Sequence, residues 1–159
     1  MSYKFYNANA RGRFTSDCVI RSISCATHRS WDDVYDELSD LAQYNGTLFD
    51  QRDFVLWYLD SNYERVTFLP KTVGELAREY PNNIILCTVR GHICCVKFGT
   101  IYDTFDPSDR LVEYAWFCWI KQKKRVLTLL YGSLSKWLKE RDCKSRMQQF
   151  ESVNSLQLT

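Results

Sequence analysis

Apolar residues in the first half of the chain recur at the spacing of an α-helix in four successive stretches, before the pattern stops at Pro81. Each stretch follows a residue that commonly caps a helix, and Thr72 is followed three residues later by Glu75, as in a capping box. The residues before Ser16 lack this period and predict an irregular leader. The pattern therefore predicts four helices, with candidate capping residues Ser16-Asp17, Ser30, Asp50 and Thr72.

After residue 83 the pattern becomes that of β-strands. Phe98-Gly99 separates two short β-rich runs and predicts the turn of a hairpin. A basic helix is expected to begin at Ser133 or Ser135. Helices followed by an antiparallel sheet of about four or five strands indicate an α+β fold. The expected strands cover 84–89, 92–97, 100–105, 114–120 and 126–130.

Length and composition indicate an ordinary globular protein. A chain of 159 residues with 45% apolar and 25% charged residues can bury a sizeable core, which excludes intrinsic disorder. We expect a main domain over 1–130, with 131–159 as a basic helix and frayed tail that packs on it or extends from it. No apolar run approaches the roughly 20 residues that span a bilayer, and no signal segment is evident. These features predict a cytoplasmic protein with no membrane partner, or a virion component if it is phage-encoded.

The net charge of +2 is unevenly distributed. Residues 121–159 hold 9 Lys and Arg against 3 Asp and Glu, so the basic excess lies in the last quarter of the chain. This excess includes Lys121, Lys123, Lys124 and Arg125. Such a patch can meet nucleic acid, an acidic protein or an anionic surface, or it can be a solvated basic helix face. A nucleic-acid-binding accessory protein is therefore one alternative for the function.

The seven cysteines show neither a disulfide framework nor a CxxC motif, and the chain has only two histidines. A zinc site is therefore poorly supplied with ligands, and we expect no metal and no cofactor. Without an export signal the thiols should be reduced, and most should be small apolar residues of the core.

Cys18 is the candidate nucleophile, because it lies in the first turn of a predicted helix, where free N–H groups and the helix dipole favour a thiolate. A thiolate nucleophile needs a base. His28 lies ten residues further along the same helix, about 15 Å away, and cannot reach Cys18. His92 follows Gly91 and begins a predicted strand, at the rim of the sheet. It is the candidate base.

The predicted hairpin brings a carboxylate to His92. With a turn at Phe98-Gly99, Phe105 lies opposite His92 and Asp103 lies diagonal to it on the same face. A carboxylate there would fix the imidazole tautomer, as the third member of a triad does. Asp106 is the alternative third residue, because a one-residue change in the turn pairs it with His92 instead. Asp106 also precedes Pro107 and can close a turn onto its own backbone.

These residues resemble a known family. A cysteine at a helix start, a histidine at a strand start and an aspartate on the next strand are similar to the papain-like cysteine peptidases. Four separated motifs, over about residues 3–120, more narrowly resemble those of small uncharacterised papain-like proteins of phages and bacteria. The four motifs are Phe5-Tyr6-Asn7-Ala8-Asn9 with Asp17 to Ile23, Ser30-Trp31-Asp32, the hairpin with Asp103-Thr104-Phe105, and Tyr114-Ala115-Trp116.

The resemblance implies a papain-like fold and hydrolysis of a peptide or isopeptide bond. Cys18 would attack the carbonyl, His92 would move the proton and Asp103 would orient His92. A protein or peptide would be the substrate, and a phage virion or host protein is a possible partner. A papain-like structural or binding protein that does not use catalysis, such as a virion or host-interaction component, is the alternative.

Two departures from papain concern the surroundings of the thiol. Papain has a glutamine six residues before its cysteine, where this chain has Gly12. The oxyanion donor could instead be Asn7, Asn9 or the backbone amides of Asp17 and Cys18, and Asn9 is preferred. Asp17 would raise the pKa of the neighbouring thiol, unless its carboxylate caps the backbone N–H groups of the helix.

Overall fold

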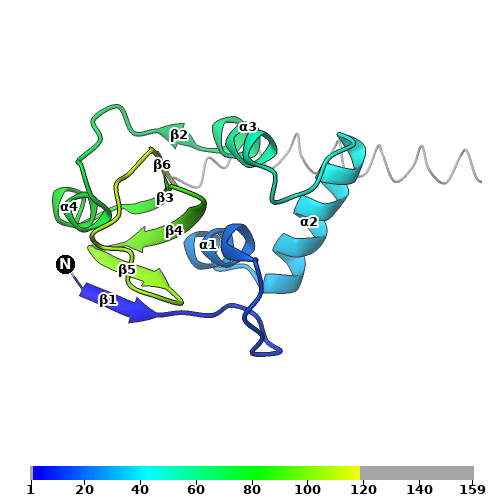
Figure 1. The fold of residues 1–159 in the computed structure, drawn as a ribbon, viewed down its shortest axis with the longest axis horizontal. Helices are drawn as coiled ribbons and strands as arrows, with labels where there is room; N and C mark the ends of the chain where they lie inside the picture. The colour runs from blue at the N-terminus through cyan, green and yellow to red at the C-terminus, as the bar shows by residue number, and fades with distance from the viewer. Residues whose placement is uncertain (1, 119–159) are drawn as a thin grey trace, which may run out of the picture. The chain divides into compact units, whose positions relative to one another are not determined.

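The computed structural model describes residues 2–118, which form an α+β fold of four helices and one six-stranded mixed sheet (Figure 1). The helices are α1 (Cys18–Thr27), α2 (Trp31–Tyr44), α3 (Arg52–Asn62) and α4 (Val73–Glu79). The strands are β1 (Ser2–Phe5), β2 (Glu64–Arg65), β3 (Ile84–Val89), β4 (His92–Lys97), β5 (Thr100–Asp103) and β6 (Tyr114–Phe117). Their order in the sheet is β1-β5-β4-β3-β6-β2.

The predicted hairpin is confirmed as β4 and β5, which pair in the expected register, with Cys95 opposite Tyr102. Phe98 and Gly99 form the turn with φ values of 51° and 73°, so both lie in the left-handed region that two-residue hairpin turns require. The turn thus sets the register that relates the ends of β4 and β5.

The prediction for the first residues was wrong. The expected irregular leader contains β1, which pairs with β5 in parallel, so the sheet is mixed rather than wholly antiparallel. All four residues of β1 are exposed, and an edge strand without a buried face leaves no apolar alternation in the sequence. The two-residue strand β2 is too short for any periodicity and was missed for a similar reason.

Two of the four helices, α2 and α4, have the side-chain caps that the sequence predicts. Ser30 Oγ accepts a hydrogen bond from the backbone N–H of Asp33 at 3.1 Å, and Thr72 with Glu75 forms the full capping box. The exceptions are α1 and α3. The N-cap of α1 is the expected Asp17, but its side chain makes no cap hydrogen bond, and the N-cap of α3 is Gln51, whose side chain also makes none. The expected cap, Asp50, lies one residue earlier.

The sheet separates two hydrophobic clusters. The first joins α1, α2 and α3 to one set of sheet residues that includes the fully buried Trp116, and the second joins α4 to the other set. In Figure 1, α1 lies next to β4, and Ser22 Oγ donates a hydrogen bond to the Ile93 carbonyl oxygen at 3.0 Å. This contact fixes the first half of α1 beside the first residues of β4.

No helix within residues 2–118 is long and apolar enough to cross a membrane. The expected strand at 126–130, the basic helix, the segment 131–159 and the patch from Lys121 to Arg125 lie outside the described residues.

Candidate functional site

Cys18 is the first residue of α1, and its half-buried thiol lies within the electrostatic influence of His92 and of the Ile93 backbone. Burial by itself would raise the pKa of the thiol. The hydrogen bond and charge of His92, the Ile93 backbone and the charge of Arg21 together outweigh burial and lower the pKa of Cys18 below its ordinary value. The surroundings of Cys18 therefore favour a thiolate.

His92 begins β4 and lies between the thiol and a carboxylate. Its Nε2 is 2.5 Å from Oδ2 of Asp103, which leaves Nδ1 for Cys18, and its ring centroid is 4.8 Å from that of Phe105. Burial lowers the pKa of His92, but the hydrogen bonds and charges of Asp103 and Cys18 raise it to about 9. At neutral pH these shifts favour a thiolate–imidazolium pair.

Asp103 ends β5 and is 4% exposed. Its Oδ1 accepts a hydrogen bond from the backbone N–H of Thr104 at 2.7 Å. Its carbonyl oxygen accepts one from the backbone N–H of Tyr6 at 2.8 Å and one from the Tyr3 hydroxyl at 3.3 Å. The N-terminal segment that includes β1 therefore holds the residue whose carboxylate contacts His92.

Asp106, the alternative third residue, does not take this place. Its Oδ1 accepts a hydrogen bond from the backbone N–H of Ser108 at 3.0 Å and so closes the turn that follows β5. Of the two candidate carboxylates, Asp103 is the one on the imidazole.

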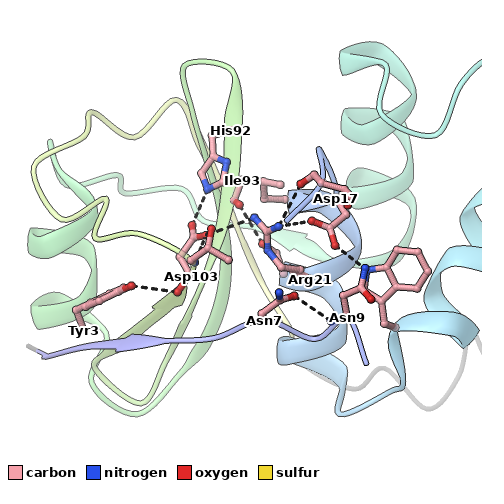
Figure 2. Close-up of polar contacts among 12 residues, drawn as sticks. Tyr3, Asn7, Asn9, Asp17, Arg21, His92, Ile93 and Asp103 are labelled. Carbon is pink, nitrogen blue, oxygen red and sulfur yellow. Dashed lines mark hydrogen bonds and ion pairs between the residues drawn. The ribbon is translucent and has the colours of Figure 1, made fainter. Parts of the chain in front are cut away.

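Arg21 is a part of the site that the sequence analysis missed. Its guanidinium lies between two carboxylates, ion-paired with Asp17 and with Nη2 3.7 Å from Oδ1 of Asp103 (Figure 2). The side chains of these three residues are only 3–7% exposed. The spacing of Asp17 and Arg21, four residues apart on a helix, was a usable signal for the first contact. Nothing in the sequence indicates the second.

The expected role of Asp17 was wrong. Asp17 is the N-cap residue of α1, yet its side chain makes no cap hydrogen bond. The carboxylate pairs with Arg21, and its Oδ2 accepts a hydrogen bond from Nε1 of Trp31 at 2.8 Å. Asp17 is 2% exposed, and a buried carboxylate is stabilised far more by a guanidinium than by neutral N–H groups. The N-terminal N–H groups of α1 consequently receive no hydrogen bond from Asp17.

The two asparagines of the leader shape the loop before α1. Oδ1 of Asn9 accepts a hydrogen bond from the Arg11 backbone at 2.9 Å, and Nδ2 of Asn7 donates to the Arg13 carbonyl oxygen at 3.1 Å. The donor of Asn7 is thus used within the loop, and the Nδ2 group of Asn9 is the part of that side chain that could act as an oxyanion donor. That role for Asn9 stays a prediction.

The remaining thiols in the described residues differ from Cys18. Burial raises the pKa of Cys118 to about 12, and contact with a second thiol and burial raise the pKa values of Cys94 and Cys95 well above the ordinary value. A hydrogen bond with Cys95 lowers the pKa of Cys25, but Cys25 is only 6% exposed. Cys18 alone among these thiols contacts an imidazole.

His28 caps the C-terminal end of α1 with a φ of 57°, at the opposite end of the helix from Cys18, and does not belong to this site. Within residues 2–118, no group of three or more His, Cys, Asp or Glu side chains is arranged to hold a metal ion. Comparisons of the chain with protein-family models, curated proteins and solved structures return no match.

Proposed function

We propose that the protein is a cysteine peptidase, or an amidase or isopeptidase of the same chemistry, with the arrangement of the papain-like enzymes. The observation that carries the proposal is the hydrogen bond between the His92 imidazole and the Asp103 carboxylate, together with the electrostatic coupling of that imidazole to the Cys18 thiol. The lowered thiol pKa and the raised imidazole pKa support it, because a nucleophile paired with a charged base needs both shifts. The substrate is a peptide or isopeptide bond of a protein or peptide.

In the acylation step the Cys18 thiolate forms a bond with the carbonyl carbon, and the electron pair of the C=O bond moves to its oxygen. The carbon–nitrogen bond then breaks, and the imidazolium of His92 gives its proton to the leaving amine. In the second step His92 takes a proton from water, the water oxygen attacks the thioester, and the carbon–sulfur bond breaks. The hydrogen bond between Nε2 of His92 and the Asp103 carboxylate holds the ring in one orientation, which leaves Nδ1 to exchange protons at the sulfur in both steps.

The developing oxyanion needs a donor near the sulfur. The first-turn N–H groups of α1 suit this role, because such groups lack intrahelical partners and Asp17 does not cap them. We therefore favour the backbone amide of Cys18 over the Asn9 side chain. The start of α1 would then have two functions: a helix N-terminus lowers the pKa of the thiol, and its free N–H groups donate hydrogen bonds to the oxyanion.

The position of the site in the fold also supports the proposal. Cys18 begins a buried helix that packs on the sheet, and His92 and Asp103 come from two neighbouring strands of one hairpin. This order of residues and elements is similar to the papain-like peptidases.

Competitive alkylation tests the proposal. The full-length protein is treated with limiting iodoacetamide at neutral pH, and each cysteine peptide is quantified by mass spectrometry. Cys18 should be modified roughly tenfold or more faster than the other thiols, and His92→Ala should remove this advantage. His28→Ala is the matched control, because that imidazole lies at the far end of α1 and should leave the rate unchanged.

Rapid alkylation of Cys18 that does not depend on His92 would contradict the proposal and favour a binding or structural protein on this scaffold. Faster modification of Cys25 or Cys118 would remove Cys18 as the nucleophile.

A further inference from the structure

A chain of polar contacts runs from α2 to the imidazole of His92. The Trp31 indole donates a hydrogen bond to Oδ2 of Asp17 at 2.8 Å, and Oδ1 of Asp17 pairs with Arg21. Nη2 of Arg21 lies 3.7 Å from Oδ1 of Asp103, whose Oδ2 is 2.5 Å from Nε2 of His92 (Figure 2). Each carboxylate thus has Arg21 at one oxygen and a second partner at the other.

The two contacts of Arg21 differ in kind. The guanidinium forms a direct hydrogen bond with Asp17, whereas its distance of 3.7 Å from Asp103 is too long for a hydrogen bond and leaves electrostatic attraction only. A direct bond between Arg21 and Asp103 would be charge-assisted and would compete with His92 for the same carboxylate. Because Asp17 holds the guanidinium, Asp103 has a positive neighbour and still keeps its hydrogen bond with His92.

Stability alone is a weak explanation for this arrangement. The side chains of Asp17, Arg21 and Asp103 are 3–7% exposed, and apolar residues of similar volume often stabilise a protein as well as a buried ion pair does. A carboxylate at residue 17 also lies next to Cys18 in the chain, where it would raise the pKa of the thiol unless its charge were balanced. Arg21 supplies that balance, and its charge is among those that outweigh burial and lower the pKa of Cys18.

We propose that Asp17 and Arg21 are positioning residues of the reaction, which hold the Asp103 carboxylate in place for His92. This inference rests on the proposed function, since it concerns the base of that site. Asp17 fixes the guanidinium, the guanidinium and the backbone N–H of Thr104 hold Oδ1 of Asp103, and Oδ2 is left to His92. Loss of Arg21 should therefore strengthen the attraction of Asp103 for the His92 proton, and loss of the Asp17 charge should weaken it.

An NMR titration of the histidines in the full-length protein tests the proposal. Cys18→Ser is the common background, because the thiol and the imidazole would otherwise titrate as a coupled pair. Arg21→Met removes the positive charge that faces Asp103, so the pKa of His92 should rise by about half a pH unit or more. Asp17→Asn frees the guanidinium to bind Asp103 directly, so the pKa of His92 should fall by a similar amount.

Three controls separate positioning from stability. Arg21→Lys keeps the positive charge and should return the pKa of His92 toward the value in the Cys18→Ser background. Arg65→Met removes an arginine that is paired with a partly exposed aspartate on β2, the edge strand of the sheet farthest from β5, and should leave the pKa of His92 unchanged. The titration curve of His28, at the far end of α1, should be the same in every variant.

Shifts of the same sign in Arg21→Met and Asp17→Asn, or an unchanged pKa of His92 in either variant, would overturn the proposal. A purely structural pair would lower stability in both variants without moving this pKa in opposite directions. If circular dichroism shows that Arg21→Met does not fold, Asp17→Asn decides: a fall in the pKa of His92 supports the proposal, and an unchanged or higher pKa overturns it.

The alkylation of Cys18 tests the proposed function separately, because it compares the otherwise unaltered protein with and without His92. If that alkylation depends on His92 and the two opposite pKa shifts are missing, the proposed function stands and only the role of Asp17 and Arg21 is refuted.

Discussion

Replacing Arg21 with methionine would test the buried charge network behind the candidate site. The guanidinium is paired with Asp17 and lies 3.7 Å from Asp103, and its side chain is 7% exposed. Methionine fills a similar volume without the charge, so Arg21→Met leaves two buried carboxylates without their shared counter-charge. Asp17 retains the Trp31 indole, and Asp103 retains His92.

The size of the effect follows from the geometry. Two unit charges about 4 Å apart attract by roughly 4 kcal/mol at an effective dielectric constant near 20, before any cost of desolvation. Removing one partner of a buried ion pair typically costs about 3–5 kcal/mol, because the other charge stays buried. We expect Arg21→Met to reduce the free energy of unfolding by about 3–5 kcal/mol, and to raise the pKa of Cys18 by removing a nearby positive charge.

Urea unfolding at pH 7, followed by tryptophan fluorescence, measures the loss of stability. Adding Asp17→Asn to Arg21→Met should recover part of it, because one unpaired charge disappears while the amide oxygen can still accept from Trp31. Arg52→Met is the matched control: the Arg52–Glu113 pair is exposed at 3.3 Å and should contribute less than about 1 kcal/mol. A loss below about 1 kcal/mol in Arg21→Met, or no recovery in the double variant, would refute the reasoning.

Three further predictions concern the residues around this network. The pKa of His92 is raised from 6.5 to about 9, so the stability that His92 adds relative to His92→Gln should be complete below pH 6.5 and lost as the pH rises through about 9. Cys18→Ser should lower the pKa of His92 in an NMR titration, and an unchanged pKa would contradict the interaction between Cys18 and His92. Asp103→Ala should reduce turnover by about 10⁴ in a kinetic assay. Asp106→Ala should leave turnover unchanged and lower the free energy of unfolding by about 1 kcal/mol. A larger loss of turnover in Asp106→Ala than in Asp103→Ala would mean that Asp106 is the third residue of the triad. Trp31→Phe removes a donor from a buried carboxylate and should lower stability by about 1–3 kcal/mol in thermal unfolding, and an unchanged Tm would exclude that role.

Much of the local structure around the candidate site could be predicted from the sequence. The turn at Phe98-Gly99 determines the register of β4 and β5, and this register alone brings Asp103 near His92. Capping residues and helical periodicity likewise predict that Cys18 lies at the start of a helix. These features depend on residues close together in the chain, whose backbone preferences and spacing carry the signal.

Contacts between distant elements depended on the tertiary structure. Cys18 reaches His92 only because α1 packs on β4 through contacts such as that of Ser22 with Ile93, 71 residues apart. The parallel pairing of β1 with β5 rests on backbone hydrogen bonds, which every residue except proline can make, so exposed side chains gave no sign of it.

The buried polar groups show the same division. The sequence determined that Arg21 follows Asp17 by one helical turn, but only the folded chain places Asp103 on the other side of its guanidinium. Charges and hydroxyls have no periodic signature, and their partners are decided by where packing of the apolar faces leaves them.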